Sequence, residues 1–305
     1  MRVLVTGGAG LVGSWLARTA PEELAGSPLE LHLTVRRSAV PADAVRQATV
    51  HTVELSDAAA VADLLDRVRP DVVVHTAYTQ SSREDVVVAT EVVAGAAAGV
   101  GAALVFTSTD VVFAGDRPPY AEDARPDPVT DYGRWKLEAE RAALAAVPDA
   151  AITRTSLVVA LDPPDRGTAG MADTWRAGRP VRLFHDELRQ PIRVEDLVAE
   201  LWAILALRRA ERAGIWHLPG PEKLSRLVLG ERMAAALSLG PVPILSASAA
   251  DHPSPRPGDP ELVPGRRGLL GVELRAVDDP VGPAVTAPAR APGPPSDDHG
   301  PGTAE

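Results

Sequence analysis

Tyr132 and Lys136 are the side chains of this sequence best suited to proton transfer, because a phenol and an ammonium group lie four positions apart. In a helix, residues at this spacing share one face about one turn apart. A free tyrosine has a pKa near 10, so exchanging its proton at pH 7 takes about 4 kcal/mol of differential stabilisation. Burial raises this pKa, whereas a nearby ammonium group or an oxidised nicotinamide ring lowers it. The alternative is an ordinary helix pair with no chemical role.

A strand end rich in polar side chains precedes this pair. Residues 103–107 are apolar in their middle and predict a buried strand, and Ser108, Thr109 and Asp110 follow at its carboxyl end. Ligands of open α/β sheets bind beyond the carboxyl ends of the strands. We therefore expect Ser108, Thr109 and Asp110 to contact a substrate. The hydroxyl of Thr109 or Ser108 could hold a carbonyl oxygen beside the Tyr132 phenol.

The first residues of the chain predict a strand, a glycine turn and a helix. Residues 3–5 are an apolar, mostly β-branched run, and residues 7–13 contain four glycines. Such glycines permit a tight turn, close approach of the backbone to a pyrophosphate, and close packing of helix on strand. A glycine-rich loop alone is weak evidence, but directly after a strand it indicates a dinucleotide-binding site. The expected cofactor contacts here are Gly7, Gly10, Leu11, Val12 and Gly13.

The ends of the following strands indicate which cofactor binds. Residues 29–35 predict a second strand, which ends in Arg36 and Arg37 where an acidic residue would bind the ribose hydroxyls of NAD. Arginines favour the 2′-phosphate of NADP instead, and solvated loop charges are the alternative. We therefore expect NADP(H), with NAD as the second choice. Strands at residues 49–54 and 71–76 are expected to end in further cofactor contacts at Leu55, Thr76, Ala77 and Tyr78.

Strands and helices alternate along the first half of the chain, which is typical of a doubly wound parallel sheet. We expect an α/β fold with a Rossmann-like sheet and a smaller C-terminal substrate-binding region. The expected domains are an NAD(P)-binding domain over residues 1–160, a substrate-binding region over 161–275 that partly interleaves with the sheet, and a disordered Pro/Gly-rich tail over 276–305. The helices expected in the second half span residues 171–178, 195–208 and 224–239.

The composition argues against several classes of partner and site. The 305 residues are 45% hydrophobic, enough for a substantial core, and their formal charge of −10 argues against nucleic-acid and anionic-membrane partners. Cysteine is absent and the histidines lack ligand spacing, so neither disulfides nor a metal site are expected. No apolar run reaches the length of a membrane span, and no leader is recognised. These features predict a cytoplasmic protein and leave open whether it forms a homodimer.

Two motifs together resemble those of the extended short-chain dehydrogenase/reductases. They are Thr6-Gly7-x-x-Gly10-x-x-Gly13 and Tyr132-x-x-x-Lys136. A third motif is most similar to that of the dTDP-4-dehydrorhamnose reductases, and it reads Ser108-Thr109-Asp110-Val111-Val112-Phe113-Ala114-Gly115. Further short segments continue this resemblance in order to about residue 275.

The resemblance implies that an NAD(P)H-dependent enzyme reduces a 4-keto nucleotide sugar. It implies that Tyr132 donates the proton, that Lys136 binds the nicotinamide ribose and tunes the tyrosine, and that Thr109 binds the carbonyl oxygen. Guanidinium groups match phosphate geometry, so Arg189, Arg193 and Arg256 are candidates for binding the substrate diphosphate, with plain surface arginines as the alternative. Gln190, within a segment that continues the resemblance, completes the expected substrate-binding residues.

The sequence departs from that family's pattern close to the expected site. His75 stands where Asn is usual, and the Asn expected near Ala89 and Thr90 is absent, which argues against a proton relay through that side chain. Val111 and residues 157–160 also differ from the usual pattern. Three alternatives therefore stay open: an epimerase or dehydratase, a reductase of another carbonyl substrate, and a non-catalytic dinucleotide-binding regulatory subunit.

Overall fold

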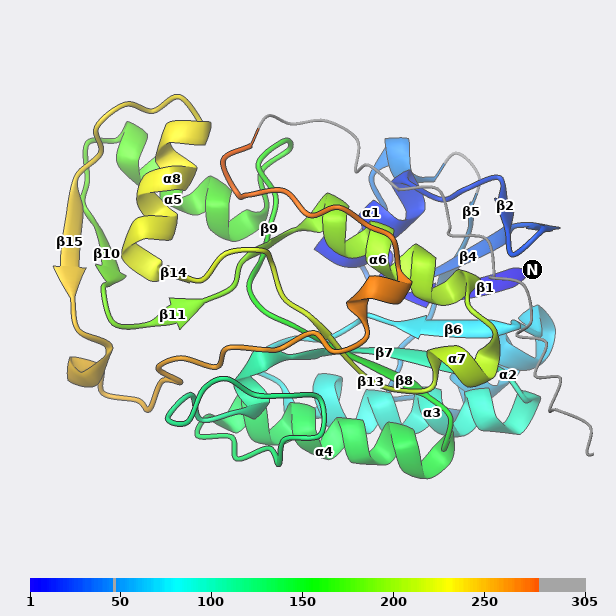
Figure 1. Cartoon of the computed structure of the whole chain (residues 1–305). Helices are drawn as coiled ribbons and strands as arrows, with labels where there is room; N and C mark the ends of the chain where they lie inside the picture. The colour runs from blue at the N-terminus through cyan, green and yellow to red at the C-terminus, as the bar shows by residue number, and fades with distance from the viewer. Residues whose placement is uncertain (46–47, 280–305) are drawn as a thin grey trace, which may run out of the picture.

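The central feature of the fold is a parallel sheet of seven strands (Figure 1). The computed structural model describes residues 1–45 and 48–279. The strand order across the sheet is β13 (Gly214–Leu218), β8 (Ala151–Thr155), β7 (Ala103–Thr109), β6 (Val72–His75), β1 (Arg2–Thr6), β4 (Glu30–Val35) and β5 (Ala48–Thr52). Strand β1 pairs with β4 on one side and with β6 on the other. The chain therefore extends the sheet first on one side of β1 and then on the other. This confirms the doubly wound α/β fold and places the switch point beside the end of β1.

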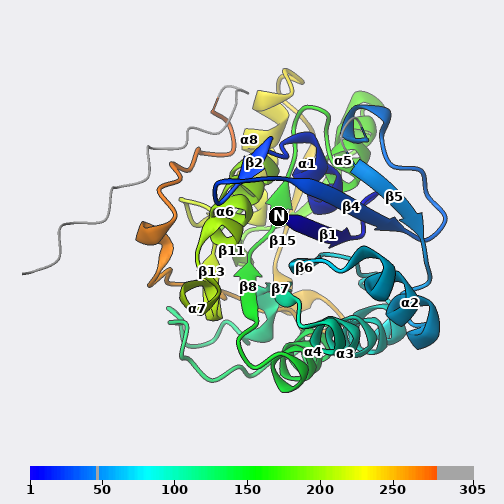
Figure 2. The same cartoon turned by 90° about the vertical axis from the view of Figure 1, so that its right-hand side faces the viewer.

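Helices cover both faces of the sheet, as Figure 2 shows in a view along the strands. Helices α1 (Leu11–Arg18) and α6 (Val194–Ala206) lie on one face, and α2 (Ala58–Val68), α3 (Ala89–Val100) and α4 (Asp131–Ala146) lie on the other. Neighbouring side chains of a strand point to opposite faces. Val3 and Val5 accordingly belong to the core under α1 and α6, whereas Leu4 belongs to the core under α2 to α4. A strand buried on both faces explains why residues 3–5 show no polar alternation.

A smaller group of elements lies beyond the carboxyl ends of the sheet strands (Figure 1). It contains α5 (Arg166–Arg176), α8 (Arg226–Ala236) and the parallel pair β10 (Val181–Phe184) and β15 (Ile244–Ala247). The two-residue strands β9 (Val158–Val159), β12 (Ile192–Arg193), β11 (Leu188–Arg189) and β14 (Leu224–Ser225) form two short ladders near it. The remaining short elements are β2 (Glu23–Leu24), β3 (Ser27–Pro28) and α7 (Arg209–Arg212).

Two expected helices begin at different residues because of their capping side chains. The helix expected at residues 171–178 is α5, which starts at Arg166 because the Asp165 carboxylate accepts hydrogen bonds from the first-turn N–H groups of Gly167 and Thr168. The helix expected at 224–239 is α8, which is capped by Ser225 and ends at Ala236. Leu224 instead pairs with Arg189 in a short ladder. Asp and Ser at these positions are typical N-caps.

The C-terminal segment over residues 266–279 packs along α6. Arg267 pairs with the buried Glu200 at 2.6 Å, and Arg275 pairs with the buried Asp196 at 2.5 Å. Val277 is 2% exposed and joins an apolar cluster that includes residues of α8. The expectation of a disordered tail is therefore wrong for residues 276–279, because Val277 is buried there, and residues 280–305 lie outside the described part. No helix within the described ranges is long and apolar enough to cross a membrane.

Candidate active site

The glycine loop between β1 and α1 is closed against the end of β6. Gly7 has a φ of +75°, and a Cβ at this residue would lie 2.9 Å from the Ala77 Cα. A Cβ on Gly13 would lie 2.3 Å from the Gly7 carbonyl oxygen, so the helix approaches the loop more closely than any side chain permits. The hydroxyl of Thr6 accepts hydrogen bonds from the backbone N–H groups of Thr76 and Ala77, which holds these two residues beside the loop.

Helix α1 begins in a way that leaves backbone donors free for an anion. Gly10 is its N-cap and provides no side-chain cap, so the N–H groups of the first turn, at Leu11 and Val12, lack the partner that a Ser or Asp would provide. A helix N-terminus with free N–H groups and a glycine loop suits a pyrophosphate. The residues present therefore fit the phosphates of a dinucleotide.

The two arginines expected to select the cofactor have different surroundings. Arg36 forms an ion pair with Asp85 at 3.1 Å and lies 3.8 Å from Glu54. Arg37 is exposed and has no ion-pair partner among the residues that the structure describes. The Arg36 pair could not be predicted from local patterns, because Asp85 lies 49 positions away. Leu55, also an expected contact, is partly buried against the core under α2.

Lys136 points from α4 back to the end of β7. Its ammonium group donates to the Thr107 carbonyl at 2.7 Å and lies 4.5 Å from the centre of the Phe106 ring. The side chain is almost fully buried, and burial lowers the pKa of Lys136 to about 7 although the Glu140 carboxylate raises it. The lysine can therefore change its charge near neutral pH.

Tyr132 lies in the first turn of α4, which the side chain of Thr130 caps. Its ring stacks on that of Tyr78 with 5.7 Å between centroids and 30° between planes. Burial raises the pKa of Tyr132 well above its ordinary value, and the Tyr78 phenol and the Asp110 carboxylate raise it further. The Lys136 ammonium does not set the pKa of Tyr132, because its hydrogen bond goes to the Thr107 carbonyl. With these neighbours, Tyr132 is thus a phenol that holds its proton.

The polar residues at the end of β7 form two separate hydrogen-bonded groups. The Thr109 hydroxyl donates to one carboxylate oxygen of Asp110 at 3.2 Å, and the Ser156 hydroxyl donates to the other at 2.6 Å. Ser108 points the other way and donates to Glu140, which also accepts two hydrogen bonds from Arg154. Of the three expected substrate contacts, Ser108 and Asp110 are buried and Thr109 is partly exposed.

A buried histidine connects two of the positions at which the sequence departs from the family pattern. His75 Nδ1 lies 2.7 Å from the Thr6 hydroxyl, and its Nε2 lies 3.1 Å from the Thr90 hydroxyl. Thr90 donates to the Val86 carbonyl, so it accepts from His75, which fixes the proton on Nε2. Burial and the charge of Lys136 lower the pKa of His75 to about 3. The imidazole is therefore neutral, and this chain of bonds ends at a backbone carbonyl.

Three arginines surround Glu187 near the end of β10. The carboxylate of Glu187 is 2% exposed and pairs with Arg189 at 3.1 Å and with Arg256. Arg226 lies near the same carboxylate, and burial lowers its pKa while Glu187 raises it. No hydrogen bond or ion pair involves the Arg226 side chain within the described ranges, and this residue lines a cavity of about 60 Å³ between α5 and α8.

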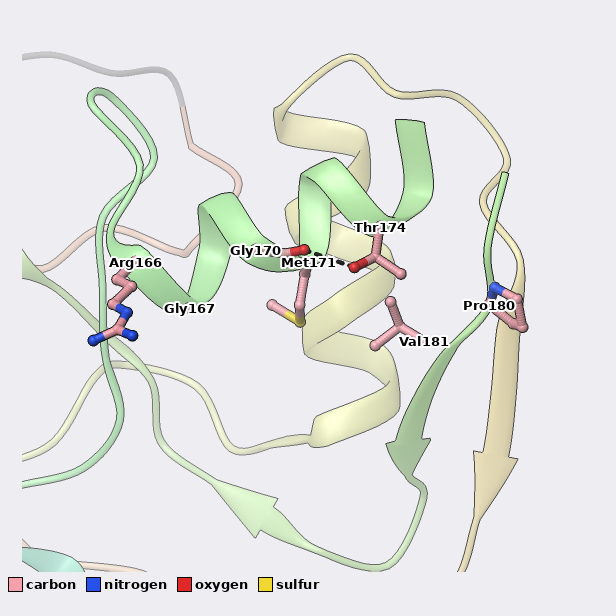
Figure 3. A pocket seen from close by; sticks show the side chains of 7 residues that line it. All are labelled: Arg166, Gly167, Gly170, Met171, Thr174, Pro180 and Val181. Carbon is pink, nitrogen blue, oxygen red and sulfur yellow. Dashed lines mark hydrogen bonds between the residues drawn. The ribbon is translucent and has the colours of Figure 1, made fainter. Parts of the chain in front are cut away.

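The other expected substrate contacts do not all reach this cluster. Gln190 lies beside it, and its side-chain oxygen accepts from the Leu262 N–H. Arg193 is almost fully buried and donates to the Asp279 carbonyl, and its binding to a diphosphate stays a prediction. A larger open hollow of about 590 Å³ lies between α5 and the start of β10 (Figure 3). Its lining residues are Arg166, Gly167, Gly170, Met171, Thr174, Pro180 and Val181, none of which was expected in a site. Within the described residues, no group of three or more acidic, histidine or cysteine side chains could hold a metal ion.

Sequence reasoning missed three residues that the structure brings to the site. Arg226 directly follows the N-cap Ser225, so its place in the first turn of α8 could have been predicted from the sequence. Glu140 gave no local sign, because its partner Arg154 lies 14 positions away, and of the partners of Glu187 only Arg189 is a sequence neighbour, whereas Arg256 is 69 positions away. Their partners meet only in the folded protein.

Comparisons with known proteins identify the family of the chain. Residues 1–263 match the family model described as the RmlD substrate binding domain. Methionine adenosyltransferase 2 subunit beta of Xenopus tropicalis is 33% identical over 242 residues, which is 72% of this chain and 71% of that protein. A probable low-salt glycan biosynthesis reductase of Haloferax volcanii is 29% identical over 301 residues, which is 92% of this chain and 95% of that protein.

Solved structures support the same fold. The crystal structure of dTDP-4-dehydrorhamnose reductase from Bacillus anthracis, in complex with NADP, has a TM-score of 0.72 at 20% identity and covers 88% of this chain and 92% of that one. The family match spans both the sheet and most of the smaller group of elements beyond it. The chain therefore belongs to the RmlD substrate binding domain family, within the extended short-chain dehydrogenase/reductases.

Proposed function

We propose that this protein is an NADPH-dependent reductase that converts the 4-keto group of a nucleotide sugar to an alcohol. The observation that carries the proposal is the meeting of α4 with the end of β7. There Lys136 is bonded to the Thr107 carbonyl, and the Tyr132 phenol is close enough to Asp110 for that carboxylate to raise its pKa. A purely binding role has no need for a phenol one helical turn before a buried lysine whose pKa is about 7.

In the proposed reaction, NADPH supplies the hydride when it is bound. The N–H groups of Leu11 and Val12 at the start of α1 would hold its pyrophosphate, and Arg37, free of ion pairs among the described residues, would bind the 2′-phosphate. The relative from Bacillus anthracis with a similar fold was crystallised with NADP. NAD is the second choice. It stays open because Arg36 already pairs with Asp85, which leaves its charge less available to a 2′-phosphate.

The substrate carbonyl would receive its proton from the Tyr132 hydroxyl. The high pKa of this phenol, caused chiefly by burial, keeps it protonated until charge develops on the substrate oxygen. The Thr109 hydroxyl would donate to that oxygen, and Lys136 would stabilise the phenolate left on Tyr132 while it carries its proton. The diphosphate would be held by Arg189, Arg226 and Arg256. Their three positive charges exceed the two negative charges of the nearby Glu187 and Asp110 carboxylates, which leaves a net positive charge for the diphosphate.

A panel of 4-keto dTDP-sugars, tested for NADPH oxidation with NADH as the control, examines this function. We expect oxidation stoichiometric with at least one sugar, and faster with NADPH than with NADH. Tight retention of the cofactor without net consumption would indicate an epimerase or dehydratase instead.

The second candidate is a dinucleotide-binding regulatory subunit. It is favoured by the 33% identity to methionine adenosyltransferase 2 subunit beta. A stable heteromeric partner in a pull-down, with no NADPH oxidation on any sugar of the panel, would establish this candidate over the reductase.

A further inference from the structure

An ion pair between Arg36 and Asp85 joins the two sides of the switch point of the sheet. Arg36 directly follows β4, and Asp85 lies in the helical turn η2 (Glu84–Val88), which comes after β6 and continues into α3. Strands β4 and β6 pair with opposite sides of β1. The Arg36 Nη1 atom nevertheless lies 3.1 and 3.3 Å from the two carboxylate oxygens of Asp85. The pair therefore spans the region beyond the carboxyl end of β1, where ligands of doubly wound sheets bind.

The two partners of this ion pair differ in their freedom to move. The Asp85 backbone N–H donates to the Ser82 hydroxyl, and the Asp85 side chain is 18% exposed. The next two residues, Val86 and Val87, are buried in the core under α2 to α4. The Arg36 side chain is 48% exposed, and its Nε and Nη2 atoms make no hydrogen bond within the described ranges. A change of partner therefore moves the arginine and leaves Asp85 in place.

Asp85 and a phosphate group would compete for the same guanidinium group. Only one nitrogen of Arg36 contacts Asp85, and the Glu54 carboxylate lies farther from it, at 3.8 Å. An exposed ion pair of this kind contributes up to about fivefold to an equilibrium constant. A phosphate accepts from two guanidinium nitrogens at once, which makes it the stronger partner. The 2′-hydroxyl of NAD carries no charge, so it cannot replace Asp85 as the counter-ion of Arg36.

We propose that Asp85 sets the preference between NADP(H) and NAD(H) by holding Arg36. The inference rests on the cofactor site of the proposed function. Arg36 stays paired with Asp85 when NAD(H) binds. When NADP(H) binds, Arg36 leaves Asp85 and joins Arg37 at the 2′-phosphate. The ion pair therefore lowers the affinity for NADP(H) and leaves the affinity for NAD(H) unchanged.

Fluorescence titration of Asp85→Asn with NADPH and with NADH tests this proposal without any sugar substrate. Asparagine keeps the size of the side chain and removes its charge, which releases Arg36. The dissociation constant for NADPH should fall by roughly two- to fivefold, the contribution of an exposed ion pair, and that for NADH should stay the same. An unchanged or higher dissociation constant for NADPH, or an equal change for both cofactors, would overturn the proposal.

Glu138→Gln is the matched control for the loss of one negative charge. Glu138 is exposed on α4 and pairs with Arg83, two positions before Asp85, instead of with Arg36. This variant should bind both cofactors as the wild-type protein does. A gain in NADPH affinity as large as that of Asp85→Asn would show that net charge is responsible, and it would refute the role of the Arg36 pair.

The double variant Arg36→Ala/Asp85→Asn separates an effect through Arg36 from direct repulsion between Asp85 and the phosphate. In the Arg36→Ala background, Asp85→Asn should leave the NADPH dissociation constant unchanged, because no guanidinium group is released. A gain as large as in the protein that retains Arg36 would contradict the proposal.

These titrations also distinguish failure of the proposal from failure of the reductase function. If the wild-type protein binds NADPH but oxidises none with any sugar of the panel, the function fails, and the titrations still decide the role of Asp85. If the protein oxidises NADPH and Asp85→Asn leaves the ratio of the two affinities unchanged, the proposal fails and the function stands. Absence of NADPH binding would refute both.

Discussion

Replacing Glu140 by glutamine should destabilise the protein and move the alkaline limb of its activity to lower pH. Glu140 lies one helical turn after Lys136 on α4 and is 2% exposed. Its two oxygens accept from Arg154 at 3.0 and 2.8 Å, and one also accepts from Ser108. The substitution removes a buried charge to which two side chains donate hydrogen bonds, and it places an amide donor toward a guanidinium group.

The expected loss of stability follows from leaving Arg154 unpaired. Breaking a buried ion pair by removing one partner costs about 3–5 kcal/mol, because the remaining charge stays desolvated. One nitrogen of Arg154 already lacks a partner among the described residues, so the guanidinium group has no alternative acceptor at hand. A total stability of about 5–15 kcal/mol leaves the variant folded at 25 °C but clearly weakened.

The expected pH effect follows from Lys136. Burial lowers the pKa of this lysine to about 7, and the Glu140 charge opposes that shift. Without the carboxylate, the pKa of Lys136 falls below about 7, so the ammonium is lost at lower pH. Because the proposed reaction uses the ammonium, kcat/KM declines as pH rises through the pKa of Lys136, and in the variant this decline begins at lower pH.

Urea unfolding and a pH profile of kcat/KM measure the two effects, with Glu140→Gln/Arg154→Met as the matched double variant. The double variant should be less destabilised than the sum of the single ones, because both buried charges are then removed. A loss below about 1 kcal/mol in Glu140→Gln would refute the stability argument. An alkaline limb that stays in place or moves to higher pH would refute the link between Glu140 and Lys136.

Three further substitutions test other parts of the site. Gly13→Ala should weaken NADPH binding by about tenfold or more, because its Cβ would lie 2.3 Å from the Gly7 carbonyl oxygen, whereas Gly95→Ala, which meets nothing within 4 Å, should bind normally; fluorescence titration with NADPH distinguishes them. Arg37→Ala should reduce affinity for NADPH by roughly 10- to 100-fold and leave that for NADH unchanged, and equal losses for both would disprove the 2′-phosphate contact. Arg226→Met should weaken binding of dTDP by a similar factor in calorimetry without changing NADPH affinity, and unchanged dTDP binding would remove Arg226 from the substrate site.

Local sequence patterns were sufficient for the sheet and the glycine loop. The apolar run at residues 3–5 predicted a buried strand, and the glycines that followed predicted the turn and helix, because each signal depends only on neighbouring residues. Asp57 is a typical N-cap residue directly before the apolar spacing of α2, and its carboxylate accepts from the Ala60 N–H at 3.0 Å. The N-caps Asp165 and Ser225 were not predicted, so α5 and α8 begin at other residues than expected.

Interactions between distant residues could not be predicted in this way. Arg193 was expected to bind a phosphate, but the chain returns near its end and places the Asp279 carbonyl against it. The stacking of Tyr78 on Tyr132 depends on how the end of β6 lies against the first turn of α4, and the sequence determines neither side-chain direction. Charge pairs such as Arg36–Asp85 depend in the same way on the folded chain. The identity of a residue predicted what it can bind, and the fold determined what it does bind.

The central claim is that the Tyr132 phenol protonates a carbonyl reduced at the end of β7, and the most direct test compares wild type with Tyr132→Phe over a single turnover. Both proteins are saturated with NADPH and mixed with the 4-keto nucleotide sugar that wild type turns over fastest. The wild-type protein should oxidise one NADPH per subunit, while Tyr132→Phe should bind NADPH with the same affinity and oxidise none. Oxidation by Tyr132→Phe at the wild-type rate would contradict the account.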